Sequence, residues 1–327
     1  MDGQAYPLKV SWLPDEEFYA LPADFPLVQS KCYHDGRVYG QDVSSGAAVA
    51  TMRKLCEGRQ NLRVLDLCCA PGQKLVALAD GLPNDTTVVG VDVSPDRLAV
   101  CQKVLRKYWT PDNHQALPRI RLYCADGTNF AQAAQDRTKL AWDSFVALSD
   151  TTAGRKRLNK SARRRQQKQL QSVMHWDWKS GTEDEDSLAI QLFDAVLVDA
   201  ECSTDGSIKH VQKRRRLEWT EERLSELVQL QKGLAESGFR LVRKGGVMVY
   251  STCSLETDQN EGVVTWLLDK MGPQAKLLSL SFPNAPSSVQ PGSVRGTLRF
   301  WPSDNKNELT GGGFFLAAIQ KQEMIDE

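Results

Sequence analysis

The stretch Arg63-Val64-Leu65-Asp66-Leu67-Cys68-Cys69-Ala70-Pro71-Gly72-Gln73-Lys74 decides the fold of this chain. It opens with a short apolar run and continues into a Pro-Gly turn, a pattern typical of a buried parallel strand. The residues from Lys74 to Leu82 then predict a helix. Because a sharp turn from a strand into a helix brings backbone N–H groups towards a ligand, this turn is a candidate binding loop.

The same alternation of strand and helix continues along the chain. Ser94-Pro95 predicts a helix start, with serine as the N-cap and proline at the first helical position. Further strands are predicted at residues 87–93, 120–124, 193–199 and 247–251, and helices at 95–108, 220–242 and 257–270. This order predicts an α/β fold with a doubly wound, mostly parallel sheet. Right-handed crossovers place the carboxyl ends of its strands at one edge, where ligands bind.

The 327 residues are enough for one large domain with additions or for two ordinary domains. Residues 1–43 are expected to form an N-terminal extension packed on a main domain of residues 44–321, with 322–327 as a tail. Residues 298–301 and 314–319 are expected to be paired edge strands. The connection at residues 135–190 is far longer than a crossover needs, and its strongly charged sequence predicts a flexible insertion. This insertion is either a solvated loop or an arm that contacts RNA phosphates.

Composition excludes several classes of protein. Hydrophobic residues make up 41% of the chain and charged residues 25%, with a formal net charge of zero, so the chain is globular. It has no secretory signal pattern and no stretch approaching the roughly 18 apolar residues of a membrane span, so we expect a soluble, intracellular protein. The eight cysteines and four histidines have no metal-ligand spacing, so no metal site is predicted.

Polar groups follow three of the predicted strands. Residues 68–74 form the turn after the first strand. Asp92 ends the second strand, where a carboxylate can accept both ribose hydroxyls, and Asp126 follows the third, where it can meet an adenine edge. Together they predict a pocket for an adenosine-containing cofactor. These groups do not by themselves choose between a nicotinamide dinucleotide and S-adenosylmethionine. The absence of a Gly-x-Gly-x-x-Gly fingerprint counts against the dinucleotide.

Two cysteines follow the fourth and fifth strands. Cys202 comes shortly after Asp199, and Cys253 lies in the segment Ser251-Thr252-Cys253-Ser254. Adjacent parallel strands would bring both cysteines to the ligand-binding edge. A thiolate that adds to carbon 6 of cytosine makes carbon 5 nucleophilic enough to attack a methyl sulfonium. A carboxylic acid near ring nitrogen 3 would protonate or hydrogen-bond the ring as charge develops.

On these residues the sequence resembles the RNA cytosine-5 methyltransferases of the Sun/Fmu family, which are RsmB-like. Residues 65–74 look like the first motif of the family, with Gln73 at its second glycine, and residues 199–203 resemble its Asp-Ala-Pro-Cys-Ser motif, with Glu201 at the proline. The segments that resemble its Thr-Cys-Ser motif, its Gln-Asp-x-x-Ser segment and its Gly-Phe-Phe ending are residues 250–255 with Asn260-Glu261, 40–45 and 313–317. The resemblance covers roughly residues 36–321.

The resemblance implies a Rossmann-like, class I methyltransferase that uses S-adenosyl-L-methionine to methylate carbon 5 of cytosine in transfer or ribosomal RNA. Cys253 would attack carbon 6, Cys202 would assist release of the product, and Asp199 would bind ring nitrogen 3. Lys74 would reach the catalytic centre. The implied cofactor-binding residues are Cys68, Cys69, Ala70, Pro71, Gly72, Gln73, Lys74, Asp92, Asp126 and Asp199.

A basic cluster after the fourth strand is a candidate RNA contact. It consists of Lys209, His210, Lys213, Arg214, Arg215 and Arg216. A phosphate backbone would pass here, and the alternative is an exposed charged loop before a helix. We expect RNA recognition to rest on the N-terminal extension, on these loops or on an accessory protein.

Two other functions stay open at this point. A catalytically inactive RNA-binding or assembly factor would retain the methyltransferase fold, and Glu201 is the feature that favours it. An NAD-dependent oxidoreductase would leave Cys202 and Cys253 without a role.

Overall fold

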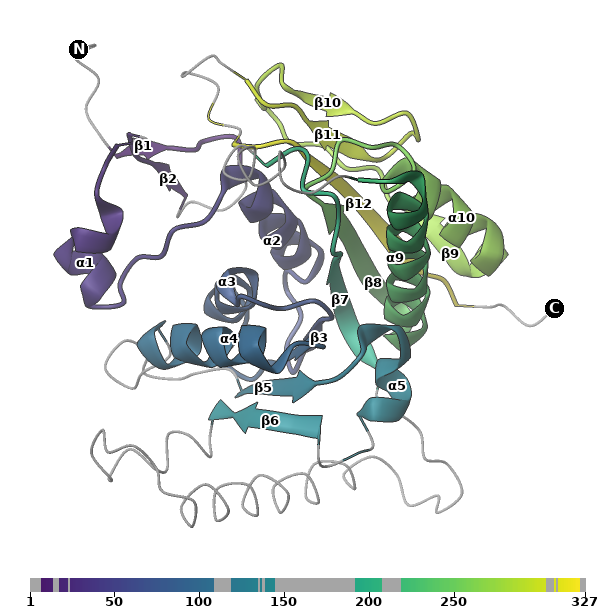
Figure 1. The fold of residues 1–327 in the computed structure, drawn as a ribbon, viewed down its shortest axis with the longest axis horizontal. Coiled ribbons are helices and arrows are strands. Elements are labelled where there is room, and N and C mark those ends of the chain that lie inside the picture. The colour runs from purple at the N-terminus through teal and green to yellow at the C-terminus, as the bar shows by residue number, and fades with distance from the viewer. Residues whose placement is uncertain are drawn as a thin grey trace.

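The computed structural model describes residues 7–13, 18–22, 24–108, 119–134, 136, 139–144, 192–207, 219–303, 309 and 311–323. A mixed sheet runs through the molecule and carries helices on both faces (Figure 1). Its strand order is β10-β11-β12-β8-β7-β3-β4-β5-β6, and β9 pairs with β12 outside this path. None of the helices described is long and apolar enough to cross a membrane.

Five parallel strands form the centre of the sheet and confirm the doubly wound prediction. They are β3 (Arg63–Asp66), β4 (Thr87–Asp92), β5 (Arg119–Cys124), β7 (Phe193–Asp199) and β8 (Val242–Thr252). From β3 the chain proceeds outward through β4 and β5, and then crosses back to β7 and β8 on the other side of β3. The order of strands therefore reverses at β3 and β7, and ligands bind at such a switch point.

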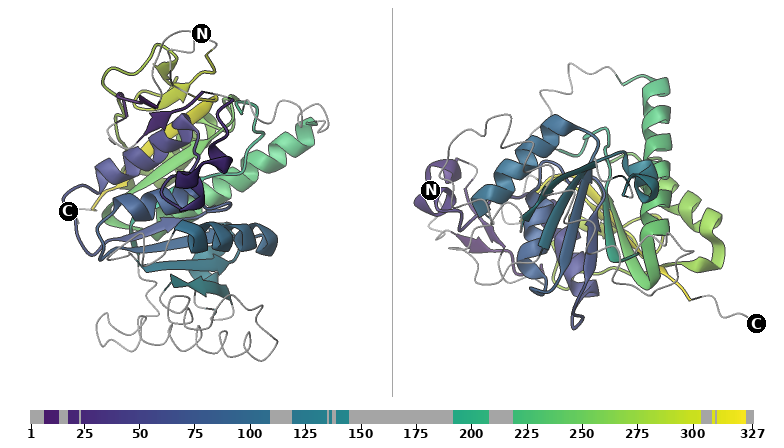
Figure 2. Two further views of the ribbon diagram at one scale, coloured as in Figure 1. Left: turned by 90° about the vertical axis from the view of Figure 1, so that its left-hand side faces the viewer. Right: turned by 90° about the horizontal axis from the view of Figure 1, so that it is seen from below.

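The central strands are buried on both faces. In β7, Val196 and Val198 pack with Leu234 and Phe239, whereas the alternate residues pack with α2. Helices α9 (Glu221–Leu241) and α10 (Glu261–Met271) cover the first face, and α2 (Val43–Leu55), α3 (Gln73–Gly81) and α4 (Pro95–Tyr108) cover the second (Figure 2). The strands therefore read as continuous apolar runs, which is why the sequence located them.

Helix boundaries follow from their caps. Thr220 caps α9 as predicted, because its hydroxyl accepts a hydrogen bond from the backbone N–H of Arg223. Helix α10 begins at Glu261 rather than at residue 257, since the preceding residues form a turn closed by the N–H of Asn260 and the carbonyl of Thr257. The short helices are η1 (Leu27–Gln29), α1 (Lys31–His34), η2 (Gly127–Asn129), α5 (Phe130–Ala133) and η6 (Gly272–Gln274).

The C-terminal strands pair as predicted, but the prediction that they lie at the edge is wrong. Strand β11 (Leu298–Phe300) pairs antiparallel with β12 (Phe314–Lys321). Strand β12 lies inside the sheet between β8 and β11, and the remaining partners are β9 (Ala275–Leu277) and β10 (Val289–Pro291). Residues 314–319 are all buried, as expected of a central strand.

Two further segments belong to the main body of the protein. The N-terminal extension forms the small sheet of β1 (Leu8–Lys9) and β2 (Tyr19–Ala20), and buried Trp12 packs on Phe282 and Phe300 with ring centroids 5.5 and 6.1 Å away. Strand β6 (Leu140–Asp143) pairs with β5, so these four residues are part of the sheet and not of a flexible insertion. Asp143 accounts for this, because buried Arg121 holds its carboxylate at 3.0 Å.

Candidate active site

A cavity of about 300 Å³ lies at the carboxyl ends of β3 and β7, where the strand order reverses. It brings together the predicted residues 68–74 and Asp199. It also has walls that the sequence did not assign to the cofactor, namely Gly40, Gln41, Asp42, Ser45 and Asp66. The segment before α2 was recognised only as a family motif, because nothing in its composition places it beside strand β3.

Gly72 shapes the turn that forms one wall of the cavity. Its φ of 109° lies in the left-handed region, and it serves as the N-cap of α3. A Cβ atom at this position would lie 2.7 Å from the sulfur of Cys101. Only glycine combines this backbone conformation with this close approach. Cys69 lies in the same turn, but its side chain is buried in the core beneath α3 and α4.

Buried polar atoms without partners line the cavity. Asp66 is 1% exposed, and its Oδ2 has no hydrogen-bond partner among the described residues. The same is true of both the nitrogen and the oxygen of the Gln41 side-chain amide. Burial, together with the nearby Asp199 carboxylate, raises the pKa of Asp66 to about 7. Such groups are costly to bury alone, so these walls fit a polar ligand.

Asp92 and Asp126 lie outside the walls of this cavity. Asp92 ends β4, where its Oδ1 accepts the N–H of Ser94 at 2.9 Å and its Oδ2 lies 3.4 Å from Arg97. Arg97 also donates to the carbonyl of Ala70 at 2.8 Å, so it connects Asp92 to the turn. Asp126 is exposed and caps η2, with its Oδ1 accepting from the N–H of Thr128.

Lys74 and Asp199 form an ion pair on the cavity wall. The Lys74 Nζ lies 2.7 Å from Asp199 Oδ2, and the Ser251 hydroxyl donates to Asp199 Oδ1 at 2.8 Å. Burial acts to lower the pKa of Lys74, but the carboxylates of Asp199 and Asp66 outweigh it, and the pKa is raised. Lys74 is therefore a fixed positive charge that acts on Cys253.

The sulfurs of Cys202 and Cys253 lie 3.2 Å apart. The Asp199 carboxylate acts on both thiols, and the Lys74 ammonium acts on Cys253. The hydrogen bond from Cys202 lowers the pKa of Cys253, and Lys74 lowers it further against the effect of burial. The same contact, together with burial, raises the pKa of Cys202 well above its usual value. The two shifts have opposite directions, so Cys253 is the thiol of the pair that loses its proton more readily.

A buried network joins the loops that carry the two cysteines. The Gln259 side chain accepts the N–H of Ser203 at 3.0 Å and donates to its hydroxyl at 2.9 Å. The hydroxyls of Ser203 and Ser254 lie 2.9 Å apart. Gln231 donates to the backbone carbonyl of Glu201, whose side chain is exposed. No local pattern points to Gln231 or Gln259, because Gln231 lies on α9 and Gln259 in the turn before α10, both well separated in the chain from Cys202.

The predicted RNA contacts Lys209, His210, Lys213, Arg214, Arg215 and Arg216 lie outside the described residues, as does most of the predicted insertion. Within the described part of the chain, no cluster of three or more histidine, cysteine or acidic side chains is arranged to hold a metal ion.

Comparison with known proteins places this arrangement in a family. The family model described as 16S rRNA methyltransferase RsmB/F matches residues 143–320, which are 178 of the 327 residues. The chain belongs to this family. A general methyltransferase-domain model matches residues 64–169 and so includes the turn at 68–74. The RsmB/F family and this domain confirm a class I methyltransferase fold with S-adenosyl-L-methionine as cofactor, and the dinucleotide alternative is wrong.

Relatives in the RsmB/F family are longer than this chain. Ribosomal RNA small subunit methyltransferase F of Aeromonas salmonicida is 38% identical over 137 residues, which are 41% of this chain and 27% of that protein. Its namesake in Escherichia coli (strain SMS-3-5 / SECEC) is 24% identical over 316 residues, or 96% of this chain and 50% of that protein. The chain thus spans about half the length of the second relative.

Solved structures of low sequence identity share the fold. NSun6 from Pyrococcus horikoshii, solved with SFG, is 20% identical with a TM-score of 0.60, over 91% of this chain and 56% of that one. A methyltransferase homolog protein from the same organism is 21% identical with a TM-score of 0.62, over 97% and 78% of the two chains.

Proposed function

We propose that this chain transfers a methyl group from S-adenosylmethionine to carbon 5 of a cytosine in RNA, through a covalent bond to Cys253. The observation that carries the proposal is the pair of thiols 3.2 Å apart beside the Lys74–Asp199 ion pair. The names of the relatives favour ribosomal RNA over transfer RNA as the substrate. Ordinary structural cysteines need no such fixed charges beside them.

The cofactor would be held by residues 68–74, whose turn leads into the amino end of α3. Asp92 would accept the ribose hydroxyls, and Asp126 would meet the adenine edge. The unpartnered atoms of Asp66 and Gln41 fit polar groups of a ligand in the same cavity. When bound, the cofactor supplies an electrophilic methyl group.

Cys253 is the nucleophile in this proposal. Its lowered pKa favours the thiolate, and the thiolate adds to carbon 6 of the ring. Negative charge then develops on the ring, and Asp199 in its acid form donates its proton to ring nitrogen 3. The ammonium of Lys74, whose Nζ lies 2.7 Å from Asp199, stabilises the carboxylate that remains.

Cys202 acts in release of the product. After carbon 5 has gained the methyl group, its proton must leave before the bond from carbon 6 to sulfur breaks and returns the thiolate of Cys253. The hydrogen bond to Cys253 is the largest cause of the raised Cys202 pKa. When Cys253 is bonded to the ring this cause is removed, so Cys202 ionises more readily and can accept the proton.

The test uses RNA and S-adenosylmethionine labelled on its methyl group, with wild type, Cys253→Ala and Cys202→Ala compared. Wild type should yield labelled 5-methylcytidine, identified by mass, and Cys253→Ala should yield none. Cys202→Ala should accumulate a covalent RNA adduct. If the wild type binds the cofactor but modifies no RNA, the chain is an RNA-binding factor or requires a partner. A different labelled nucleoside would overturn the proposed site of methylation.

A further inference from the structure

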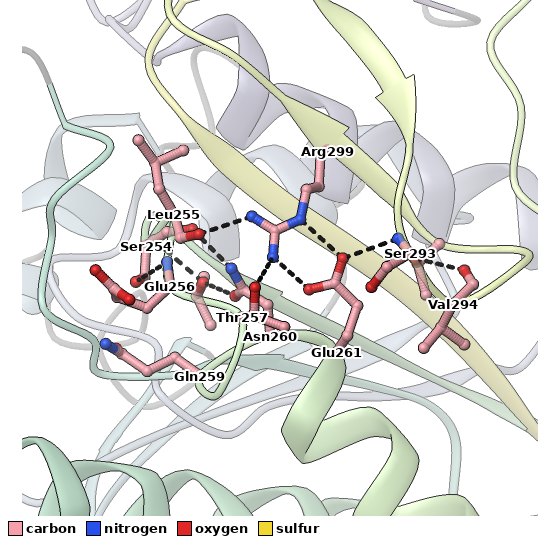
Figure 3. Close-up of polar contacts among 12 residues, drawn as sticks. Ser254, Leu255, Glu256, Thr257, Gln259, Asn260, Glu261, Ser293, Val294 and Arg299 are labelled. Atoms are coloured by element: carbon pink, nitrogen blue, oxygen red, sulfur yellow. Dashed lines mark hydrogen bonds and ion pairs between the residues drawn. The ribbon is translucent and has the colours of Figure 1, made fainter.

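A buried ion pair lies on the far side of the loop that follows Cys253. Arg299 extends from β11, and Glu261 is the first residue of α10 (Figure 3). They are 8% and 3% exposed. The Nε of Arg299 donates to Glu261 Oε1 at 2.7 Å, and its Nη2 donates to Glu261 Oε2. The guanidinium therefore grips the carboxylate at two points.

The remaining donors of Arg299 bind the loop itself. Its Nη1 donates to the backbone carbonyl of Leu255 at 2.7 Å, and its Nη2 reaches the hydroxyl of Thr257 at 3.4 Å. The backbone N–H of Ser293 donates to Glu261 Oε1 at 3.2 Å. Figure 3 shows the guanidinium between the loop on one side and Glu261 on the other. The charge pair thus fixes the position of residues two and four places after the nucleophile.

Asn260 holds the same loop from within. Its Oδ1 accepts the Thr252 hydroxyl at 2.5 Å, and its Nδ2 donates to the carbonyl of Ser254 at 2.9 Å. Both contacts bracket Cys253 in the sequence. Strand β8 ends at Thr252, so sheet pairing does not extend to Cys253. Beyond the end of the strand, the loop is therefore held by the Asn260 side chain and by the backbone N–H of Gly206, which donates to the Cys253 carbonyl.

Stability alone is a poor reason for this ion pair. Taking two charges out of water carries a large desolvation cost, and a well-packed apolar pair of similar size is often as stable. The two-point geometry and the bonds to the loop give the pair a directional role instead. Reacting groups must be held to within about 0.5 Å of their productive positions. An irregular loop beyond the end of a strand needs added contacts to meet that tolerance.

We propose that Arg299 is a positioning residue for Cys253, acting through Glu261 and the Leu255 carbonyl to hold the thiol against Cys202 and beside Lys74. The residue touches neither the cavity nor the reacting atoms. The inference rests on the proposed nucleophilic role of Cys253. Loss of the contacts between Arg299, Glu261 and the Leu255 carbonyl should therefore change the reactivity of Cys253. The cofactor cavity should keep its shape, because none of these residues lines it.

The test compares three variants of the whole chain. Arg299→Gln removes the charge of Arg299 and its ion pair with Glu261. Arg299→Lys keeps the charge but not the two hydrogen bonds that the guanidinium donates to the Glu261 carboxylate. The double variant Arg299→Met with Glu261→Gln removes the ion pair without leaving an unpaired buried charge. The control is Arg240→Gln, which removes an exposed ion pair with Glu236. Circular dichroism establishes folding, calorimetry measures cofactor binding, and peptide mass spectrometry follows iodoacetamide alkylation of Cys253 against pH.

We expect the midpoint of Cys253 alkylation to rise by about one pH unit in Arg299→Gln and the double variant, a tenfold loss of thiolate at neutral pH. Arg299→Lys should lie between these and wild type, cofactor binding should be unchanged, and kcat should fall without a change in KM. A wild-type alkylation profile in a folded variant would overturn the inference. If Arg299→Gln does not fold, the alkylation profile of the double variant tests the inference. If the double variant does not fold either, the profile of Arg299→Lys tests it. Alkylation needs no RNA, so absence of methyl transfer in wild type would sink the proposed function without deciding this point.

Discussion

The sulfurs of Cys202 and Cys253 lie 3.2 Å apart, although 51 positions separate them in the chain. Parallel pairing of β7 and β8 accounts for this, because Asp199 and Ser251 are in register and each cysteine follows the end of its strand. The two thiols are not equivalent. Cys202 is buried and Cys253 is partly exposed, and the pKa of Cys253 is lowered whereas that of Cys202 is raised, so the proposed nucleophile is the thiol that ionises more readily.

Removal of Cys202 should therefore weaken Cys253 as a nucleophile. The Cys202 thiol is the first cause of the lowered Cys253 pKa, so Cys202→Ala should raise that pKa. A rise of one unit lowers the thiolate fraction at neutral pH about tenfold. Iodoacetamide alkylation of Cys253 against pH measures it, with exposed Cys32 as the internal control. An unchanged midpoint would show that the two thiols do not interact.

Lys74→Met should impair catalysis by removing the cation next to Asp199. Preorganised charges of this kind contribute about 10²–10³-fold to rate constants, and the loss should appear in single-turnover methyl transfer. Lys74 also lowers the pKa of Cys253, so the alkylation midpoint should rise in the same variant. Lys54→Met is the matched control, since Lys54 forms an exposed pair with Glu57. Full activity of Lys74→Met would remove Lys74 from the mechanism.

How far the sequence predicts this site depends on whether the signal is local. The strand that ends at Asp199 and the strand that ends just before Cys253 are predicted from their apolar runs, so the meeting of the two cysteines at the ends of these strands could also be predicted. Helix α2 could not, because its residues 46–52 are buried at every position and show no amphipathic period. Gln41 could not be predicted as a wall of the cavity, because nothing in the composition of its segment places it beside strand β3. The Arg299–Glu261 pair joins residues 38 positions apart, one at the start of α10 and the other on strand β11, and no local sequence pattern predicts such a contact.

Asp66 should make the stability of the fold depend on pH. Burial, with Asp199 and Asp92 adding to it, raises its pKa from 3.8 to about 7, while Lys74 opposes the shift. The folded state then binds the proton more tightly than the unfolded state. The contribution of Asp66 to the free energy of unfolding is therefore most favourable below about pH 4, and it is lost as the pH rises to about 7.

Asp66→Asn should remove that component. Relative to the variant, wild type should lose on the order of a few kcal/mol of unfolding free energy between these pH values. Urea unfolding of both proteins across the range measures the difference. Exposed Asp85→Asn is the control and should follow wild type, since surface substitutions change stability little. A constant difference between wild type and Asp66→Asn would mean that Asp66 keeps an ordinary carboxylate in the folded protein.

Gly72→Ala should damage both stability and cofactor binding. The alanine would have to adopt the left-handed backbone conformation of Gly72, and its Cβ atom would lie 2.7 Å from the Cys101 sulfur. Strain of the backbone costs about 1 kcal/mol and overpacking adds about 1–3 kcal/mol. Gly58→Ala is a matched control, because Gly58 has a φ of 76° with nothing within 4 Å of its added Cβ. Gly58→Ala therefore introduces the backbone strain without the steric overlap that Gly72→Ala adds.

Urea unfolding and calorimetric binding of S-adenosylmethionine distinguish the two glycines. Gly58→Ala should lose about 1 kcal/mol and bind the cofactor as wild type does. Gly72→Ala should lose more and bind the cofactor weakly, since the backbone of the turn must shift away from Cys101. Equal losses in the two variants, with cofactor binding intact in both, would show that the turn at 68–74 tolerates a side chain and does not hold the cofactor through its backbone.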